Sequence, residues 1–375
     1  MSSHASPTDR SLPPVTSLNL DHDVVTLTQA ICDVGSVSGR EGPLADAVQA
    51  ALAGRDHLEV VRDGDAVLAR TRLGRSERVV LAGHLDTVPL ADPANLPTRR
   101  LDGVGAGGGE VLWGRGTVDM LGGVAVQLRL AGQLTSPSRD VTYVWYDCEE
   151  VDAARNGLAR LAATRPDWLT GDFAVLLEPT RGEVEGGCNG TLRVDVTVAG
   201  VAGHSARPWT ADNAVHKTGE LLVRLASYQA REVEVDGLVY REALQAVGIR
   251  AGVAGNVIPD ECVLTVNHRF APSRSAPEAV AFVREFFSGY DVRVTDVAAG
   301  ARPGLHRPAA RDFVAALGLP VTAKVGWTDV ARFDALGVPA VNFGPGDPAL
   351  AHADDEHCPV QQYRDVEAAL LRWLS

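Results

Sequence analysis

The chain has 375 residues and a mass of 39.6 kDa, more than one ordinary domain core holds, so we expect about two domains. Apolar residues make up 45% and charged residues 22% of the sequence, a balance typical of a globular protein that excludes a disordered chain or a small disulfide-stapled scaffold. The net charge of −13 argues against a protein that binds the backbone of nucleic acids, because that function needs a basic surface.

The beginning of the chain shows no sign of a globular element. Residues 1–20 are rich in Ser, Pro and Thr without periodicity, and we expect a flexible tail there. They also lack the segments of a signal peptide, and no apolar run in the sequence approaches the ~20 residues that span a bilayer. The five cysteines are scattered, which favours reduced thiols over a zinc ribbon or redox motif. We therefore expect a cytoplasmic protein with no membrane or nucleic-acid partner.

From Asp21 onward, helical stretches alternate with short β-rich runs. A helix is expected over residues 42–54, and strands over 78–82, 141–146 and 173–177. This alternation predicts an α/β domain with a mostly parallel sheet. Acidic or histidine residues directly follow each of these strands, and binding sites in open α/β sheets form outside the carboxyl ends of the strands.

A second unit is expected over residues 182–299. Its order of elements, β-α-β-β-α-β, is that of a split βαβ (ferredoxin-like) fold. The expected strands cover 192–198, 243–251, 262–270 and 291–297, and the expected helices 213–229 and 277–287. The α/β pattern resumes near residue 300, with a strand over 340–343 and a closing helix over 366–374. The larger domain, 21–181 and 300–375, is therefore predicted to be discontinuous, with the second unit inserted into it.

The first candidate metal ligand follows the strand at 78–82. His84 and Asp86 stand two apart just beyond this strand, where alternation along an extended chain points both side chains the same way. A metal-bound imidazole commonly needs a carboxylate on its other nitrogen, and Asp86 could be that partner of His84. Taken alone, a His-x-Asp pair is more often a hydrogen-bonded loop pair.

Other candidate ligands begin later loops of the same domain. Asp119 follows a glycine-rich turn at the start of a predicted helix, where an aspartate is also a common N-cap. Glu149 and Glu150 are adjacent carboxylates at a strand end, which repel unless a cation or proton lies between them, although a solvated acidic loop has the same sequence pattern. Glu178 and His352 each begin a polar loop, and neither indicates a site by itself.

Counted together, these side chains indicate a metal site. The ligand set consists of imidazoles and carboxylates suited to two zinc ions: His84, Asp119, Glu150, Glu178 and His352. One carboxylate bridging both ions, with one histidine and one further carboxylate on each, gives three protein ligands per ion and leaves a position for a shared water. The pKa of such a water falls towards ~7. Glu149, the acid left over, is then the natural general base.

Six short motifs follow one another along nearly the whole chain. They are GHLDTVP at 83–89, GRGTVDMLGG at 114–123, the pair Glu149-Glu150, LEPT at 177–180, GHSA at 203–206 and NVIP at 256–259. These motifs and their order resemble the zinc aminoacylase and carboxypeptidase superfamily. Within it, GWTDVARF at 326–333 and NFGPGD at 342–347, followed by His352, are most similar to the actinobacterial succinyl-diaminopimelate desuccinylases.

This resemblance assigns the metal ligands to two ions. It implies that His84, Asp119 and Glu178 bind one zinc ion, and that Glu150, His352 and the same bridging Asp119 bind the other. Carboxylate-rich sites of this kind also accept cobalt or manganese. The implied fold is a zinc-hydrolase catalytic domain with an inserted dimerisation and lid domain.

The resemblance also implies roles beyond metal binding. Asp86 would orient His84, and Glu149 would take a proton from the attacking water and later deliver one to the leaving amine. His204, on the inserted domain, resembles the histidine that reaches the active site of a partner subunit and donates to the oxyanion. The expected quaternary structure is therefore a homodimer formed through the inserted domain.

Substrate-binding residues are expected on the inserted domain and near residue 328. Arg269 lies at a strand end, where a guanidinium can grip a carboxylate through two parallel hydrogen bonds. Asn256 could add an amide contact, and Thr328 could line the pocket. The chain departs from the commoner desuccinylases at Asn189-Gly190-Thr191, where they carry an arginine and a serine, and Asn189 is therefore expected to bear on the acyl group recognised.

The implied reaction is hydrolysis of N-succinyl-LL-2,6-diaminopimelate to succinate and LL-2,6-diaminopimelate, a step in the synthesis of lysine and cell-wall precursors. The expected partner is thus a small dicarboxylate N-acyl amino acid. Within the same chemistry, the alternatives are a related deacylase, for example one acting on acetylornithine, or a metallocarboxypeptidase. A catalytically silent protein that holds a structural metal is the alternative from another class, but it has no need of Glu149 beside a full ligand set.

Overall fold

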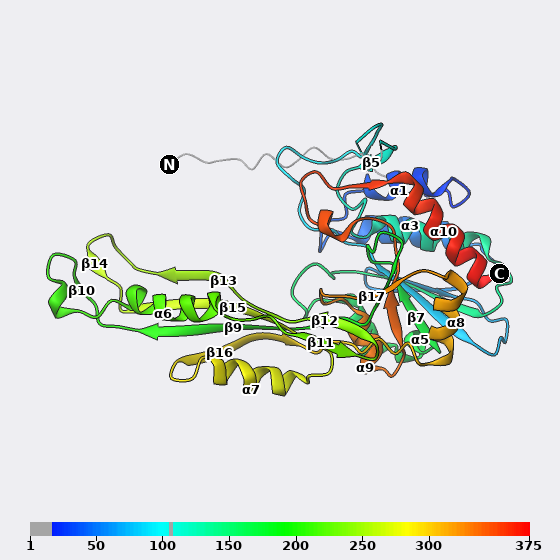
Figure 1. The fold of residues 1–375 in the computed structure, drawn as a ribbon. Coiled ribbons are helices and arrows are strands. Elements are labelled where there is room, and N and C mark those ends of the chain that lie inside the picture. Colours follow the sequence, from blue (N-terminus) through cyan, green and yellow to red (C-terminus); the bar gives the residue numbers. More distant parts are fainter. Residues whose placement is uncertain (1–16, 105–107) are drawn as a thin grey trace. The chain divides into compact units, whose positions relative to one another are not determined.

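The computed structural model describes residues 17–104 and 108–375, which form two compact units (Figure 1). The first comprises the described part of Met1–Val184 with Ala309–Pro320 and Val341–Ser375, and the second comprises Glu185–Pro308 with Val321–Ala340. The first unit thus consists of three separate stretches of the chain and the second of two. The segment 321–340, which the sequence pattern assigned to the larger domain, belongs instead to the second unit.

The predicted tail has a different boundary from the one expected. Residues 1–16 lie outside the described residues. Leu18 and Leu20 are buried, with 6% and 1% of their surface exposed, and the carbonyl of Leu20 accepts a hydrogen bond from Arg129. The expectation that the tail extends to residue 20 is therefore wrong, because two isolated leucines beside a Ser- and Pro-rich stretch give no periodic signal of their burial.

The principal sheet has eight strands in the order β1-β2-β6-β3-β7-β18-β8-β17. Their bounds are β1 Glu59–Asp63, β2 Ala66–Arg70, β3 Arg78–His84, β6 Asp140–Tyr146, β7 Phe173–Leu176, β8 Val184–Gly186, β17 Val321–Ala323 and β18 Ala340–Asn342. The predicted mostly parallel sheet is confirmed at its centre, where β3 pairs in parallel with both β6 and β7. At one edge, β1 and β2 form an antiparallel hairpin. β6 is buried along its whole length, as expected for a strand covered on both faces.

The first unit contains several helices, and one of them, α3, is buried almost all round. They are α1 Val24–Cys32, α2 Gly42–Leu52, α3 Leu121–Gln133, α4 Gly157–Thr164, α5 Pro166–Leu169, α8 Pro308–Leu317 and α10 Val360–Leu374, with the 3₁₀ turn η2 Pro348–Leu350. α3 contacts the backbone at the end of β7 so closely that a Cβ atom on Gly123 would lie 2.2 Å from the carbonyl oxygen of Leu177. This glycine therefore lets the start of α3 lie against the end of β7.

A small antiparallel sheet joins segments from distant parts of the chain. Its strands, in the order β19-β5-β4, are β4 Arg99–Leu101, β5 Val111–Trp113 and β19 His357–Pro359. The ladder between β5 and β19 pairs Trp113 with His357 and continues in a bond from the Gly114 N–H to the carbonyl of Glu356. The glycine-rich turn that follows β5 thus meets the loop that precedes β19.

The second unit contains the predicted split βαβ arrangement. Its antiparallel sheet has the order β13-β15-β9-β16, and its elements are β9 Gly190–Ala199, α6 Ala214–Ala226, β13 Ala243–Ala251, β15 Glu261–Phe270, α7 Ala276–Phe286 and β16 Asp291–Ala298. Apolar side chains from one face of this sheet and from both helices form its core. Ser275 and Glu278 form a capping box that starts α7.

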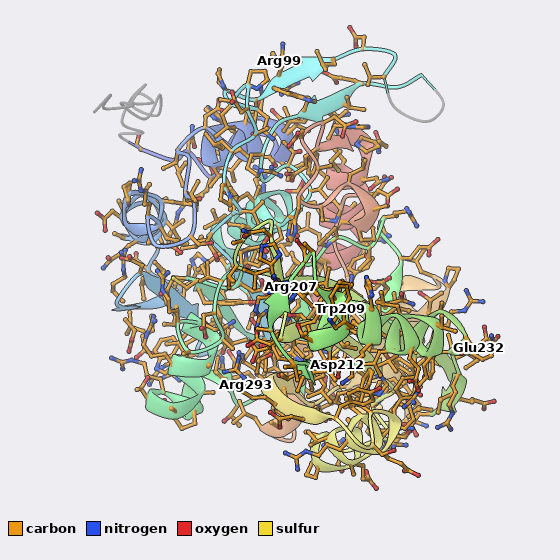
Figure 2. All side chains as sticks on the ribbon, turned by 90° about the vertical axis from the view of Figure 1, so that its left-hand side faces the viewer. Arg99, Arg207, Trp209, Asp212, Glu232 and Arg293 are labelled. Atoms are coloured by element: carbon orange, nitrogen blue, oxygen red, sulfur yellow. The ribbon has the colours of Figure 1, made fainter. Side chains whose placement is uncertain are left out.

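Shorter elements of the second unit were not expected from the sequence. They are β10 Gly203–His204, η1 Pro208–Thr210, β11 Glu232–Val235, β12 Leu238–Arg241, β14 Val257–Ile258 and α9 Val330–Ala335. β10 pairs with β14, and β11 pairs with β12. Trp209, on η1, has 78% of its surface exposed (Figure 2). Over the part of the chain that the structure describes, none of the helices combines the length and the apolar character needed to cross a membrane.

Candidate metal centre

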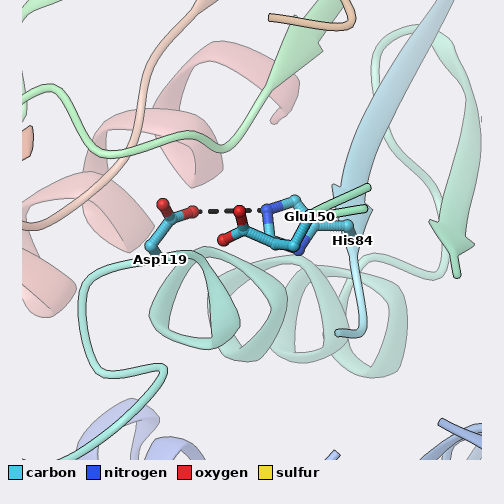
Figure 3. A group of neighbouring side chains, drawn as sticks. All are labelled: His84, Asp119 and Glu150. Atoms are coloured by element: carbon cyan, nitrogen blue, oxygen red, sulfur yellow. Dashed lines mark ion pairs between the residues drawn. The ribbon is translucent and has the colours of Figure 1, made fainter. Parts of the chain in front are cut away.

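Three of the predicted ligands gather at the carboxyl ends of the central strands (Figure 3). His84 ends β3, Asp119 lies in the turn before α3, and Glu150 follows β6. One ligand atom from each lies within 4.8 Å of the others, and His84 Nε2 is 3.2 Å from Asp119 Oδ1. Two neighbouring parallel strands end at the same edge of the sheet, which brings their following residues together.

His352 completes the group from the far end of the chain. Its Nε2 lies 3.2 Å from Asp119 Oδ2 and 2.9 Å from Glu150 Oε1. The Asp119 carboxylate therefore presents one oxygen to each of two imidazoles. His352 itself has φ of 66°, a conformation uncommon for a residue other than glycine.

The electrostatics of this group favour added positive charge. Burial alone would raise the pKa of Asp119, but the nearby imidazoles of His352 and His84 outweigh burial and hold the pKa well below its usual value. Asp119 and Glu150 in turn raise the pKa of His352 to about 10. Burial opposes protonation of His84, yet the carboxylates around it raise its pKa well above the usual value. The carboxylates thus draw cations to the centre.

The donor set also fits a divalent cation. Within the described residues, Asp119 Oδ1 is buried without a well-aligned hydrogen-bond donor, although His84 Nε2 is near it. A buried carboxylate oxygen in this state is costly unless a cation supplies the missing contact. Imidazole nitrogens and carboxylate oxygens are ligands that zinc accepts in catalytic sites.

Asp86 connects the strand that carries His84 with the segment that carries Glu149 and Glu150. Its Oδ1 accepts the backbone N–H of Glu149 at 2.9 Å, and its Oδ2 accepts that of Glu150 at 3.0 Å and the Ser38 hydroxyl at 2.7 Å. His84 Nδ1 is 2.9 Å from the main-chain oxygen of Asp86 and 3.5 Å from its carboxylate. The nearest contact to His84 therefore comes from the Asp86 backbone, and the carboxylate mainly fixes the two glutamates.

The two remaining acids of the expected site lie close to His84. Glu178 follows β7 and has only 5% of its surface exposed. The negative charges of Glu149 and Glu178 both contribute to the raised pKa of His84. The contact between Gly123 and Leu177 holds the turn of Asp119 beside the segment of Glu178.

Sequence reasoning missed Glu356, whose buried carboxylate holds the backbone of the turn that carries Asp119. Its Oε1 accepts the backbone N–H groups of Val118 at 2.8 Å and Asp119 at 3.1 Å, and its Oε2 accepts Arg115 Nη1 at 2.8 Å. Burial outweighs the lowering effect of these donors, and the pKa of Glu356 is raised to about 7. The sequence around 351–356 is an acidic loop, and nothing in its pattern distinguishes the one buried acid from its exposed neighbours.

His204 and Asn256 lie together within the second unit. His204 pairs with Val257 across the β10–β14 ladder, and the Ser205 N–H donates to the Asn256 carbonyl. The exposed imidazole accepts the Ala206 N–H at Nδ1, with a distance of 3.0 Å. Its Nε2 is thus left for another partner.

The expected substrate contacts differ in their surroundings. Arg269, on β15 opposite Thr191 of β9, is half-buried, and burial followed by the charge of Arg193 lowers the pKa of its guanidinium. Asn189 is fully buried, and its amide donates to the carbonyls of Arg241 at 2.8 Å and Val325 at 3.1 Å. The amide nitrogen thus serves the fold, whereas Oδ1 is buried without a hydrogen-bond partner among the described residues, and the expected substrate contact stays a prediction.

Thr328 is also buried, with 6% of its surface exposed. Its carbonyl accepts the N–H of Ala331 and faces the thiol of Cys188, and both contacts lie within the second unit. The Thr328 side chain is thus almost fully enclosed, whereas the sequence predicts a residue that lines the substrate pocket.

Comparison with known proteins places the chain among metallohydrolases. The model of peptidase family M20/M25/M40 matches residues 80–375. A Mycobacterium tuberculosis protein, provisionally named as the succinyl-diaminopimelate desuccinylase DapE, is 53% identical over 360 residues, which cover 95% of this chain and 99% of that protein. The succinyl-diaminopimelate desuccinylase of Corynebacterium glutamicum is 46% identical over 369 residues, which cover 96% and 98%.

Solved structures share the fold at low sequence identity. The M20 family metallo-carboxypeptidase Sso-CP2 of Sulfolobus solfataricus matches with a TM-score of 0.74 at 12% identity, over 94% of this chain and 98% of its own. YXEP of Bacillus subtilis, described as a dinuclear metal-binding peptidase of the M20 family, matches with a TM-score of 0.65 at 13% identity, over 93% and 96%. At these identities the likeness concerns the fold alone.

Proposed function

Since this chain belongs to the M20/M25/M40 peptidase family, we propose that it is a succinyl-diaminopimelate desuccinylase, which cleaves N-succinyl-LL-2,6-diaminopimelate into succinate and LL-2,6-diaminopimelate. The two relatives with this name span nearly the whole chain and support the substrate. The observation that carries the chemistry is the Asp119 carboxylate between His84 and His352, one oxygen towards each. This is the arrangement that a carboxylate bridging two cations requires.

The proposed metal centre holds two zinc ions. His84, Asp119 and Glu178 would hold one, and Asp119, Glu150 and His352 the other. Cobalt would suit either site, since imidazole and carboxylate ligands accept both metals. When bound, such ions supply Lewis acidity, which polarises an amide carbonyl and makes water more acidic.

The side chains of this protein would carry the proton transfers. Glu149 accepts a proton from water as the water attacks the amide carbon, and it returns that proton to the nitrogen when the carbon–nitrogen bond breaks. Succinate and a free amine result, so protons and charge balance. The Asp86 carboxylate accepts the backbone N–H of Glu149 and so fixes the main chain from which the Glu149 carboxylate extends. This position is set before the reaction begins. His204 would donate to the oxyanion from its free Nε2.

Arg269 is the strongest candidate for gripping a substrate carboxylate. Among the described residues, no acceptor is hydrogen-bonded to its half-buried guanidinium, and nearby Arg193 adds repulsion. A carboxylate would relieve both costs through a bidentate contact. Asn256 and Thr328 are proposed as further contacts, whereas Asn189 would act indirectly by fixing the segments around Arg241 and Val325.

We also propose a homodimer formed through the second unit. β13 is an edge strand of its sheet, and it exposes Val247 and Ile249 at 59% and 55%. Val223 on α6 is also exposed, at 70%. An exposed, apolar edge strand tends to pair with another chain. Sedimentation of the wild type and of Ile249→Glu would test the dimer, since a charge at this edge should shift it to monomers.

The function is tested by succinate release from N-succinyl-LL-2,6-diaminopimelate. We expect activity that a chelator removes and added zinc restores. Acetylornithine and a dipeptide, offered to the same zinc-loaded protein, cover the alternative deacylase and carboxypeptidase activities. Fast cleavage of either one without turnover of the succinyl compound would replace the proposed substrate. As a biosynthetic enzyme, the protein is proposed to work in the cytoplasm.

A further inference from the structure

Arg115 and Glu356 form a buried ion pair next to the candidate metal centre, and neither residue is one of its proposed ligands. Arg115 and Glu356 have 3% and 0% of their side chains exposed, and Arg115 Nη1 lies 2.8 Å from Glu356 Oε2. The other carboxylate oxygen, Oε1, accepts the N–H groups of Val118 and Asp119. Among the described residues, the side-chain hydrogen bonds of Glu356 therefore all come from donors in the turn that carries Asp119.

The same pair reaches the loop that carries His352. Arg115 Nη1 donates to the carbonyl of Ala353 at 3.2 Å, and Nη2 approaches the carbonyl of His352 at 3.5 Å. Arg115 belongs to the Asp119 turn and Glu356 to the His352 loop, so each residue bonds to the opposite segment. The two segments are thus tied together by side chains as well as by the β5–β19 ladder.

Stability alone is a poor explanation for this pair. Taking two charges out of water costs several kcal/mol per ion in general, and packed apolar residues often serve as well. Arg115 Nε is in addition buried without a hydrogen-bond partner among the described residues. His352, one residue from a carbonyl that Arg115 binds, has an unfavourable positive φ of 66°. Such costs are expected where a precise arrangement matters more than the free energy of folding.

We propose that Arg115 and Glu356 are positioning residues that fix Asp119 and His352 relative to each other, and so set the affinity of the ion that these two ligands share. The inference rests on the proposed two-metal centre. Neither residue would contact substrate or metal. Their effect is preorganisation: the ligands stand at their working separation before the ion arrives, so binding does not have to order them.

Glu356→Gln tests this inference with little change of shape. The amide oxygen can still accept the N–H groups of Val118 and Asp119, but the amide nitrogen would face Arg115, donor against donor, and leave its charge unpaired. Glu367→Gln is the matched control. Glu367 pairs with Arg129 at 2.8 Å, and the two side chains are 12% and 13% exposed, in the same unit but without contact to a ligand segment.

The readouts are zinc affinity by competition with a chromophoric chelator, zinc stoichiometry, thermal stability, and kcat and KM. We expect Glu356→Gln to bind the ion shared by Asp119 and His352 about 10- to 100-fold more weakly than the wild type does. This range is typical of residues that support metal ligands. We expect kcat to fall more than KM rises, and high zinc to restore part of kcat. Glu367→Gln should lose stability while its zinc affinity stays unchanged.

Zinc affinity of Glu356→Gln within twofold of the wild type would overturn the inference, whatever its stability. If this variant is not recovered folded, Arg115→Lys carries the same test, because lysine keeps the buried charge but cannot donate to carboxylate and carbonyls as a planar fork. Unchanged zinc affinity in Arg115→Lys would refute the inference equally. A wild type that binds fewer than two ions would instead refute the proposed centre, and the inference with it.

Discussion

Replacing Gly123 by alanine would test whether the close approach of α3 to the end of β7 builds the metal centre. The new Cβ atom would stand 2.2 Å from the carbonyl oxygen of Leu177 and 2.8 Å from its Cβ, whereas ordinary contacts begin at 3.4 Å. The helix and the strand end must therefore separate by about 1 Å. Because one side of the contact is backbone, no rotamer change can absorb this shift.

The expected effect on stability is the difference of two terms. Alanine gains about 1 kcal/mol over glycine in a helix interior, and overpacking a rigid contact costs about 1–3 kcal/mol or more. We therefore expect Gly123→Ala to lose up to about 2 kcal/mol of unfolding free energy. The shift also separates Asp119 from Glu178, so the affinity for the ion shared by these two ligands should fall.

Urea unfolding in the presence of a chelator measures the first effect without contribution from metal binding. Zinc competition measures the second. Gly219→Ala is the control, since Gly219 lies in the interior of α6 and its Cβ would meet nothing within 4 Å, so about 0.4–1 kcal/mol of stabilisation is expected. A Gly123→Ala protein stabilised as much as Gly219→Ala, with unchanged zinc affinity, would refute the reasoning.

Three further predictions concern single side chains. Glu149→Gln should lower kcat by about 10²- to 10⁴-fold while two zinc ions remain bound, and unchanged turnover would exclude Glu149 as the general base. Arg269→Ala should lower kcat/KM for the succinyl substrate by about 10- to 100-fold, the worth of a charged hydrogen bond, and an equal loss for an uncharged acyl group would assign Arg269 to the fold instead. Asp195 has a pKa lowered to about 2 by Arg250 in the first place, and also by Arg293 and Thr265. The Asp195 charge should therefore contribute about 1–2 kcal/mol of stability above the unfolded-state pKa of 3.8, a figure reduced because both arginines are largely exposed to solvent. This contribution is lost as the pH falls from about 4 towards 2. Urea unfolding of Asp195→Asn and wild type should accordingly show a difference at pH 7 that shrinks below pH 4, whereas a constant difference would contradict the assigned pKa.

The ligand-bearing strands could be predicted because their signals are local. The apolar run before His84 and the one before Glu149 each end where the structure ends β3 and β6, to within two residues. Parallel pairing then requires their ends to meet, so the gathering of His84 and Glu150 follows from topology. Asp119 was less certain, since it could equally have been an N-cap. The structure gives Met120 that position without any side-chain cap, which leaves the Asp119 carboxylate to the two imidazoles.

Features that depend on distant contacts could not be predicted in this way. Glu356 is the last acid of a polar loop, and only the Arg115 turn, 241 positions away, explains its burial. Asn189 was interpreted from a departure in a motif, but its amide is used by Arg241 and Val325, which local patterns do not connect to it. The assignment of segment 321–340 to the second unit has the same cause, since short elements carry little signal of the core they join.

The order of the ligands along the chain bears on protein synthesis. His84, Asp119, Glu150 and Glu178 all precede the second unit, whereas His352 and its supporting Glu356 follow it. A nascent chain on the ribosome therefore exposes an incomplete, strongly acidic ligand set while the whole second unit is being translated. The three proposed ligands of one ion, His84, Asp119 and Glu178, are already made by then, whereas the ion that Asp119, Glu150 and His352 would hold can be captured only after His352 has been made and β19 has paired with β5. Loading of this ion is thus a late event, and products truncated before His352 should leave the ribosome without a complete two-metal centre.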